Sequence, residues 1–342
     1  MNFALRQVDL HVRHPFTTAR GTTGVQSAVV VELEQDGLRG YGEAPQVPYY
    51  RATAAGTQAA LEQLRPQIEA ARLDDPIDLW EQFQPLLEQT PAAACALDVA
   101  AHDLWGKLHG MPLWKLWGLE TGCAPWSDYT IGIDSVDDML RKLAEFPDFP
   151  VYKIKLGTSA DLSALRALRQ QSDAVFRVDA NCGWTVEQMF DNGPELMELD
   201  VELIEQPLPP ERWDAMRRVF SQSPLPLLAD ESCRGLRDLE HCAACFHGVN
   251  IKLAKCGGLT PARRMIVRAR QLGLRVMIGC FLESTINISA AAQLAPLADY
   301  VDLDGALLLA DDIARGVCIK RGRLVYPAVD GCGVTLAPGM RG

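Results

Sequence analysis

Seven apolar, β-rich segments in the last two thirds of the chain mostly end in charged side chains, and these charges recur at nearly regular intervals. Lys155, Asp179, Glu205, Asp230 and Lys252 follow one another about every 25 residues, which is the length of one strand and one helix in a parallel α/β fold. Ionised side chains in buried parallel strands are unfavourable unless they are paired or bound to a metal ion. Five of them in phase at strand ends therefore indicate a functional site.

From about residue 126 the sequence alternates between strand and helix patterns. Eight strand-like segments, from WSDYTIGI to YVDLDG, are separated by seven helical segments. This alternation predicts an α/β fold, a TIM-like (β/α)7β barrel over residues 121–316 whose last helix is missing or replaced. In such a barrel, inward side chains at the carboxyl ends of the strands converge on one site.

The first third of the chain predicts an α+β capping domain, over residues 1–120. Residues 4–14 and 27–45 alternate apolar and polar side chains, and Asp36-Gly37 marks a hairpin turn within the second stretch. Helical patterns follow at about 54–72, 76–88 and 91–109.

Two polar stretches of this cap, residues 16–25 and 46–56, are predicted to be mobile loops. The tail, residues 317–342, has strand character and many glycines. We expect it to pack back on the cap and to complete it.

Composition excludes several classes of function. A net charge of -11 without a basic cluster argues against nucleic acid as a partner, and no apolar stretch is long enough to span a membrane. The N-terminus lacks the pattern of a signal peptide, so a cytoplasmic location is expected. The ten cysteines are scattered, and we expect them to be reduced.

Three carboxylates on successive predicted strands suggest a metal site. Asp179, Glu205 and Asp230 would converge without His or Cys beside them, and oxygen-only ligation suits Mg²⁺. Asn181 shares the face of Asp179 and is predicted to support it. The alternative is a set of structural ion pairs with arginines of the barrel.

Two lysines lie on predicted strands two and six, opposite each other across the barrel. Lys155 and Lys252 are candidate bases, because burial, a metal cation and the neighbouring ammonium of Lys153 would all lower a lysine pKa. The alternative makes them ion-pair partners of the three carboxylates. Lys255 has the other strand parity and is predicted to be structural or to support the site residues without touching a ligand.

Asp302 and Asp304 end the last strand on one face. A pair of carboxylates in this arrangement suits an ammonium group of a ligand, and the alternative is a loop that exposes both acids to solvent. Histidine is absent from the predicted strand ends, so a His–Asp base is not expected.

These motifs resemble those of the enolase superfamily, and within it the Lys–Lys subgroup that includes the muconate cycloisomerases. YKIKLG, DAN, EQP, ADES and NIKLAKCGG are similar to that subgroup's first lysine strand, its three metal-ligand strands and its second lysine strand. MIGCFLEST followed by DLDG is similar to the dipeptide epimerases, typified by L-Ala-D/L-Glu epimerase. The resemblance covers nearly the whole chain.

The resemblance implies a Mg²⁺-dependent dipeptide epimerase with one Mg²⁺ per subunit. Lys155 and Lys252 would exchange the α-proton of the C-terminal residue through a metal-stabilised enediolate. The D-x-D pair, Asp302 and Asp304, would hold the α-ammonium group of the dipeptide. Members of the family often form symmetric assemblies, so a homo-oligomer is expected.

The stretches 16–25 and 46–56 resemble the specificity loops of the family, although YYRAT lacks the Gly-Glu often found in the second. Arg20 and Arg51 lie in them, and we expect them to contact an acidic side chain of the substrate. The alternative is that either arginine is only solvated.

Other functions stay open at this point. An N-acylamino acid racemase or an o-succinylbenzoate synthase would share the Mg²⁺ and both lysines but would not need the acid pair. Muconate cycloisomerisation is a third candidate. A non-catalytic binding protein on the same barrel is the alternative from a different class.

Overall fold

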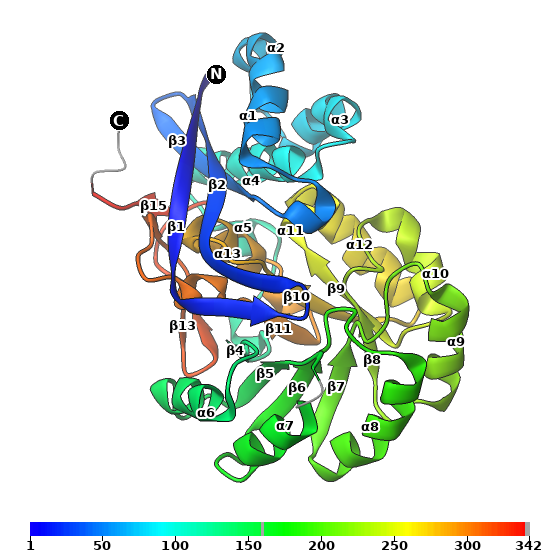
Figure 1. Cartoon of the computed structure of the whole chain (residues 1–342). Helices are drawn as coiled ribbons and strands as arrows, with labels where there is room; N and C mark the ends of the chain where they lie inside the picture. Colours follow the sequence, from blue (N-terminus) through cyan, green and yellow to red (C-terminus); the bar gives the residue numbers. More distant parts are fainter. Residues whose placement is uncertain (159–160, 339–342) are drawn as a thin grey trace.

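The computed structural model describes residues 1–158 and 161–338 of the chain. Its largest element is an eight-stranded parallel sheet in which each strand pairs with the next along the chain, from β4 to β11 (Figure 1). The strands are β4 Tyr129–Ile131, β5 Val151–Lys155, β6 Val175–Asp179, β7 Val201–Glu205, β8 Leu227–Ala229, β9 Gly248–Lys252, β10 Arg275–Gly279 and β11 Tyr300–Asp302.

The first and last strands of this sheet meet, which closes the barrel. Ser127, just before β4, forms a parallel bridge with Val301 of β11. Arg177 Nη1 donates to the Val301 carbonyl at 3.1 Å and to Asp128 Oδ2 at 3.0 Å, and so joins the two edges from inside. The predicted (β/α)7β barrel is confirmed.

Seven helical connections cover the outside of the barrel. They are α6 Val136–Glu145, α7 Asp161–Arg169, α8 Val186–Glu198, α9 Trp213–Gln222, α10 Leu239–Ala243, α11 Leu253–Cys256 with α12 Leu259–Gln271, and α13 Thr285–Ala292. Local sequence sets their ends: α8 begins with a capping box in which Thr185 and Gln188 exchange hydrogen bonds. The main core lies between these helices and outward-facing strand residues such as Ile154, Val178 and Ile251.

The N-terminal part holds an antiparallel sheet of three strands, in the order β1 Asn2–Thr18, β2 Gly21–Gln35 and β3 Leu38–Pro45. The turn at Asp36-Gly37 joins β2 to β3, as predicted, and both residues have positive φ, as type I′ hairpin turns require. The expectation of a loop at residues 16–25 was wrong. There β1 and β2 continue as a paired ribbon that turns at Ala19 and Arg20 and runs toward the barrel (Figure 1).

The second polar stretch, residues 46–56, is a compact turn. A bridge between Val47 and Ala52 closes it around a short 3-10 helix, η1 Pro48–Tyr50. The cap helices follow as α1 Ala54–Gln63, α2 Arg65–Ala70, α3 Pro76–Leu87 and α4 Pro91–Leu108, which confirms the three helical patterns with one break at Leu64.

Strand β3 packs on the Ala-rich helix α4 at very short range. A Cβ built on Gly42 would lie 2.0 Å from the Ala96 carbonyl oxygen, and one on Gly40 would lie 2.2 Å from that of Ala100. Only glycine fits at these two positions, so the sequence GYG in β3 and the alanines of α4 specify one contact.

Buried polar groups fasten the cap to the barrel. Glu43 of β3 accepts from the backbone N of Ser284, at the start of α13, at 3.1 Å, and also from its hydroxyl. Asp98 of α4 accepts from Thr260 N at 2.9 Å and from Thr260 Oγ1 at 2.7 Å. Each carboxylate receives two hydrogen bonds from one barrel residue, so the two parts are held in a fixed relation.

The end of the chain forms one small hairpin and one two-stranded antiparallel pair that encloses it in sequence. β12 Ala314–Arg315 pairs with β15 Thr335–Leu336, and β13 Cys318–Lys320 pairs with β14 Arg323–Val325. Asp103 of α4 accepts from Cys332 N at 2.8 Å, which links the tail to α4. Residues 339–342 lie outside the described residues, and the domain boundaries near 120 and 316 stay predictions.

Within residues 1–158 and 161–338, none of the helices combines the length and the apolar character that are needed to cross a membrane.

We predict that Gly42→Ala destabilises the cap by about 2–3 kcal/mol, because the added methyl group would overlap a helix carbonyl that cannot rotate away. Urea unfolding followed by circular dichroism measures this. Gly24→Ala on β2 is the control, since nothing lies within 4 Å of its added Cβ. Equal stability of the two variants would contradict the close contact between β3 and α4.

Candidate active site

The register of the barrel strands places charged side chains next to one another at the carboxyl ends. Lys155 pairs with Asp179, and Asp179 pairs with Glu205, across β5, β6 and β7. On the other side of the barrel, Lys252 pairs with Gly279, which in turn pairs with Asp302. Residues in register on parallel strands point to the same face, so these side chains all enter the barrel.

Three carboxylates form a compact group there. Asp179, Glu205 and Asp230 each offer an oxygen within 4.8 Å of the other two, and all three are buried. Three buried carboxylates from neighbouring strands fit Mg²⁺, which prefers oxygen ligands. The residues predicted to hold a metal are therefore brought together with a suitable donor set.

The backbone beside this group is held in an uncommon conformation. Asn181 and Cys182 after β6, and Gln206 after β7, have φ values of 43°, 68° and 35°, in the left-handed region. The Asn181 amide N donates to Asp179 Oδ1 at 2.8 Å, and its Nδ2 donates to Asp179 Oδ2 at 3.1 Å. This backbone turn orients the Asp179 carboxylate, as expected for a functional site that stores local strain.

Four buried lysines compensate the carboxylates. Lys155 Nζ lies 2.6 Å from Asp179, and Lys252 Nζ lies 2.8 Å from Asp230. Lys153 Nζ lies 2.8 Å from Glu205 and 2.6 Å from Asp302, so it bridges two carboxylates. The fourth lysine, Lys255, lies 2.6 Å from Asp230.

The pKa values follow from this pairing. Burial opposes ionisation, but the ammonium groups of Lys252 and Lys255 hold the pKa of Asp230 well below its usual value. Burial would likewise lower the pKa of Lys252, yet Asp230 and Glu205 raise it. The sequence led us to expect a lowered pKa for Lys252. The pKa is raised instead, because the nearby carboxylates outweigh burial.

Lys255 has the supporting position that was expected of it, whereas sequence reasoning did not identify Gln206. β9 ends at Lys252 and the chain then turns through α11, which brings the Lys255 Nζ to the Asp230 carboxylate and carbonyl. Gln206 Oε1 accepts from the backbone N of Asp230 and of Ser232, both at 3.0 Å. The EQP motif therefore supplies both a carboxylate and the amide that positions the next one.

The acid pair lies at the end of β11. Asp302 ends the strand, and Asp304 begins the short 3-10 helix η5 Asp304–Leu308, where its Oδ2 accepts from Thr130 N at 2.5 Å. Burial and the neighbouring Asp302 raise the pKa of Asp304 to about 7. By contrast, Asp302 has a pKa of about 2, because Lys153 and Lys252 outweigh burial. Both acids are buried, which excludes the exposed-loop alternative.

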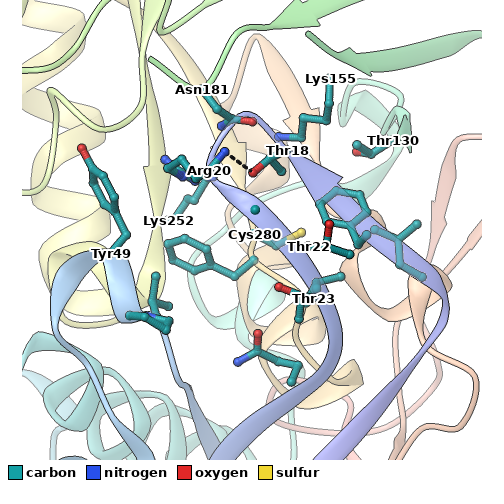
Figure 2. A pocket seen from close by; sticks show the side chains of 18 of the residues that line it. Thr18, Arg20, Thr22, Thr23, Tyr49, Thr130, Lys155, Asn181, Lys252 and Cys280 are labelled. Carbon is teal, nitrogen blue, oxygen red and sulfur yellow. Dashed lines mark hydrogen bonds between the residues drawn. The ribbon is translucent and has the colours of Figure 1, made fainter. Parts of the chain in front are cut away.

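A cavity of about 370 Å³ lies between the cap and the carboxyl ends of the barrel strands (Figure 2). Its wall includes Lys155, Lys252, Asn181, Asp302 and Asp304. Asp179, Glu205 and Asp230, called the metal-type group below, do not line it. Lys153 and Lys255 do not line it either. Of the four lysines, the two candidate bases Lys155 and Lys252 are thus the ones that a ligand in the cavity can contact.

The β1–β2 ribbon covers this cavity. Thr18, Arg20, Thr22 and Thr23 of the ribbon line it, and Arg20 N donates to Thr18 Oγ1 at 3.2 Å at the tip (Figure 2). Arg20 is therefore brought to the site. Arg51 is not: it is the exposed residue that ends η1, and it does not line the cavity.

The capped barrel and its acidic group define the class of protein. Residues 2–118 match the model of the mandelate racemase / muconate lactonizing enzyme N-terminal domain, and residues 135–340 match the enolase C-terminal domain-like model. The chain belongs to the enolase superfamily.

Within this superfamily, the chain is similar to dipeptide epimerases. It is 48% identical over 336 residues to an L-Ala-D/L-amino acid epimerase of Flavobacterium johnsoniae, with 98% of this chain and 100% of the relative covered. The structure of an Enterococcus faecalis dipeptide epimerase complexed with Mg and L-Leu-L-Tyr superposes with a TM-score of 0.90 at 30% identity, over 97% and 98% of the two chains. A substrate-liganded L-Ala-D/L-Glu epimerase from Bacillus subtilis gives a TM-score of 0.92 at 25% identity, over 98% of each chain.

We predict that Lys255→Met lowers the free energy of unfolding by about 3 kcal/mol, because it removes one cation from the buried Asp230. Denaturant unfolding in the presence of a chelator measures this effect without a contribution from metal binding. Lys320→Met, at an exposed position of β13, makes the same chemical change and is expected to cost less than about 0.5 kcal/mol. A loss as small as that of the control would contradict a supporting role for Lys255.

Proposed function

We propose that this chain is a Mg²⁺-dependent dipeptide epimerase that inverts the α-carbon of the C-terminal residue by 1,1-proton transfer. One observation carries the proposal: two lysines from opposite sides of the barrel and a buried acid pair line the same cavity. The similarity to dipeptide epimerases, one of them complexed with Mg and a dipeptide, supports it.

The two lysines are placed for two-base chemistry. Lys155 lies on β5 and Lys252 on β9, four strands apart in a barrel of eight, so they approach a bound carbon from opposite sides. The neutral amine of one lysine removes the α-proton, and the ammonium of the other delivers a proton to the opposite face. The roles exchange when the other epimer is the substrate.

Asp179, Glu205 and Asp230 would hold the cation, with Asn181 and Lys153 orienting them. Bound Mg²⁺ would polarise the substrate carboxylate, so that the α-proton becomes more acidic.

The acid pair fixes the other end of the substrate. Asp302 and Asp304 accept hydrogen bonds from the α-ammonium group, and burial makes this charge-assisted contact strong. The runner-up, an N-acylamino acid racemase acting on N-succinyl substrates, would place a carboxylate at this end of the cavity, where the two acids would repel it.

The test is α-proton exchange in D₂O with Mg²⁺. L-Ala-L-Leu, N-succinyl-L-Leu and cis,cis-muconate are incubated separately with the protein, and NMR follows deuterium at the α-carbon or loss of muconate. Exchange at the C-terminal residue of the dipeptide alone, lost in a chelator, is expected. Exchange of the N-succinyl substrate alone would favour the racemase, and absence of any turnover would favour a binding protein.

We predict that Lys155→Ala and Lys252→Ala each reduce epimerisation by about 10²–10⁴-fold, since each removes one of the two acid–base groups. Each variant is expected to exchange the α-proton of only one epimer with solvent, which NMR in D₂O detects. Lys115→Ala, at an exposed position, is the matched control. Near-normal epimerisation by either active-site variant would rule out the two-base scheme.

We predict that Asp304→Asn raises KM for dipeptides about tenfold or more, because a hydrogen bond between charged groups is lost. The Kd for Mg²⁺, measured by calorimetry, is expected to change less than about threefold, since Asp304 is not one of the proposed ligands Asp179, Glu205 and Asp230. Asp311→Asn, exposed and seven positions further on, controls for the change of charge. Equal loss of dipeptide and Mg²⁺ binding would instead indicate a structural role.

A cytoplasmic location and a homo-oligomeric assembly stay predictions from the sequence.

A further inference from the structure

One cation at the mouth of the cavity already has a carboxylate of its own. Arg20, at the tip of the β1–β2 ribbon, donates from Nη1 to Oε1 of Glu231, which follows Asp230 at the end of β8. The Glu231 side chain is 0% exposed, whereas that of Arg20 is 30% exposed. The guanidinium also stacks on Tyr49, with its Cζ 4.7 Å from the ring centroid.

Glu231 depends on this partner. Its Oε1 also receives a long hydrogen bond of 3.4 Å from Asn181 Nδ2, and its Oε2 is buried without a hydrogen-bond partner in the described part of the chain. A buried carboxylate that loses its cation is left uncompensated, which is strongly unfavourable. Arg20 is thus the internal counter-ion of Glu231.

The other cations that line the cavity are paired as well. Lys155 and Lys252 each contact a carboxylate of the metal-type group, and Arg51 does not reach the cavity. The rest of the wall includes the uncharged residues Thr18, Thr22, Thr23, Gln46, Tyr49 and Phe281. No lining residue of the described chain therefore offers an unpaired cation to a substrate.

Arg20 lies on the side of the cavity that the C-terminal residue of a dipeptide would occupy. Its partner Glu231 is adjacent to the proposed metal ligand Asp230, where the substrate carboxylate would lie. The ammonium group would lie at the other end, at Asp302 and Asp304. The side chain nearest Arg20 is then that of the residue whose α-carbon is inverted.

We propose that the site selects dipeptides with an uncharged C-terminal side chain, because Arg20 neutralises Glu231 and is not available to bind a substrate carboxylate. The inference rests on the proposed epimerase function, and it replaces the expectation that Arg20 and Arg51 contact an acidic side chain. An acidic side chain that reached Arg20 would share it with Glu231, and the two carboxylates would repel each other. The net charge of -11 adds to this repulsion.

The test compares kcat/KM for L-Ala-L-Glu and L-Ala-L-Gln, which have C-terminal side chains of the same shape and different charge. The wild-type ratio of Glu to Gln is expected to be about 1 or below, and Arg20→Met, which leaves the Glu231 carboxylate without its cation, is expected to leave the ratio unchanged or to lower it. A preference for Glu of about tenfold or more that disappears in Arg20→Met would overturn the inference.

Glu231→Gln supplies the matched gain of function, because it keeps the shape of the side chain and removes the charge that holds Arg20. The Glu-to-Gln ratio is expected to rise about tenfold in this variant and to return to the wild-type value in Arg20→Met/Glu231→Gln. An unchanged ratio in an active Glu231→Gln protein would contradict the inference.

Both kcat/KM values of the ratio are measured on the same protein. A variant that loses activity equally toward both dipeptides therefore keeps its Glu-to-Gln ratio. The wild-type and Arg20→Met ratios decide the question even where Glu231→Gln fails to fold. If neither dipeptide exchanges its α-proton, the proposed function fails, and this result is distinct from exchange that strongly favours Glu.

Discussion

The structure depends on the compensation of buried charge at the carboxyl ends of the barrel strands. Asp179, Glu205, Asp230 and Asp302 lie within ion-pair distance of Lys153, Lys155, Lys252 or Lys255, and nearly all of these side chains are excluded from solvent. Removal of one partner would leave a charge in a medium that solvates it poorly. The same arrangement fits a cation site, because a bound cation would share with the lysines the compensation of these carboxylates.

The cap depends on the barrel in a different way. Its own core is built on the close contact between β3 and α4, where Gly40 and Gly42 leave room for helix carbonyls. Its position on the barrel is set by few but fully buried hydrogen bonds, such as those of Glu43 with Ser284 and of Asp98 with Thr260. Rigid attachment matters here, because the wall of the cavity is shared between the two parts.

The barrel and most of the charged constellation were predictable from the sequence, because strand parity and a repeat of strand and helix are local properties. The prediction of a loop failed at residues 16–25, which form a ribbon although their composition is that of a loop. The pairing of Arg20 with Glu231 joins residues 211 positions apart, and no local pattern reports it. The exclusion of Arg51 from the cavity depends on how η1 turns, which composition does not determine.

The β1–β2 ribbon has one further consequence. Strand β3 supports β2 only from Ala28 onward, so the tip beyond it is a ribbon of two strands, which is marginally stable alone. Its order rests on contacts with the barrel, among them the hydrogen bond from Ile133 N to the Thr17 carbonyl at 2.9 Å. Detachment of the tip would open the cavity while the barrel and the body of the cap stay folded. Passage of a ligand at this point would therefore require only local contacts of the tip to break.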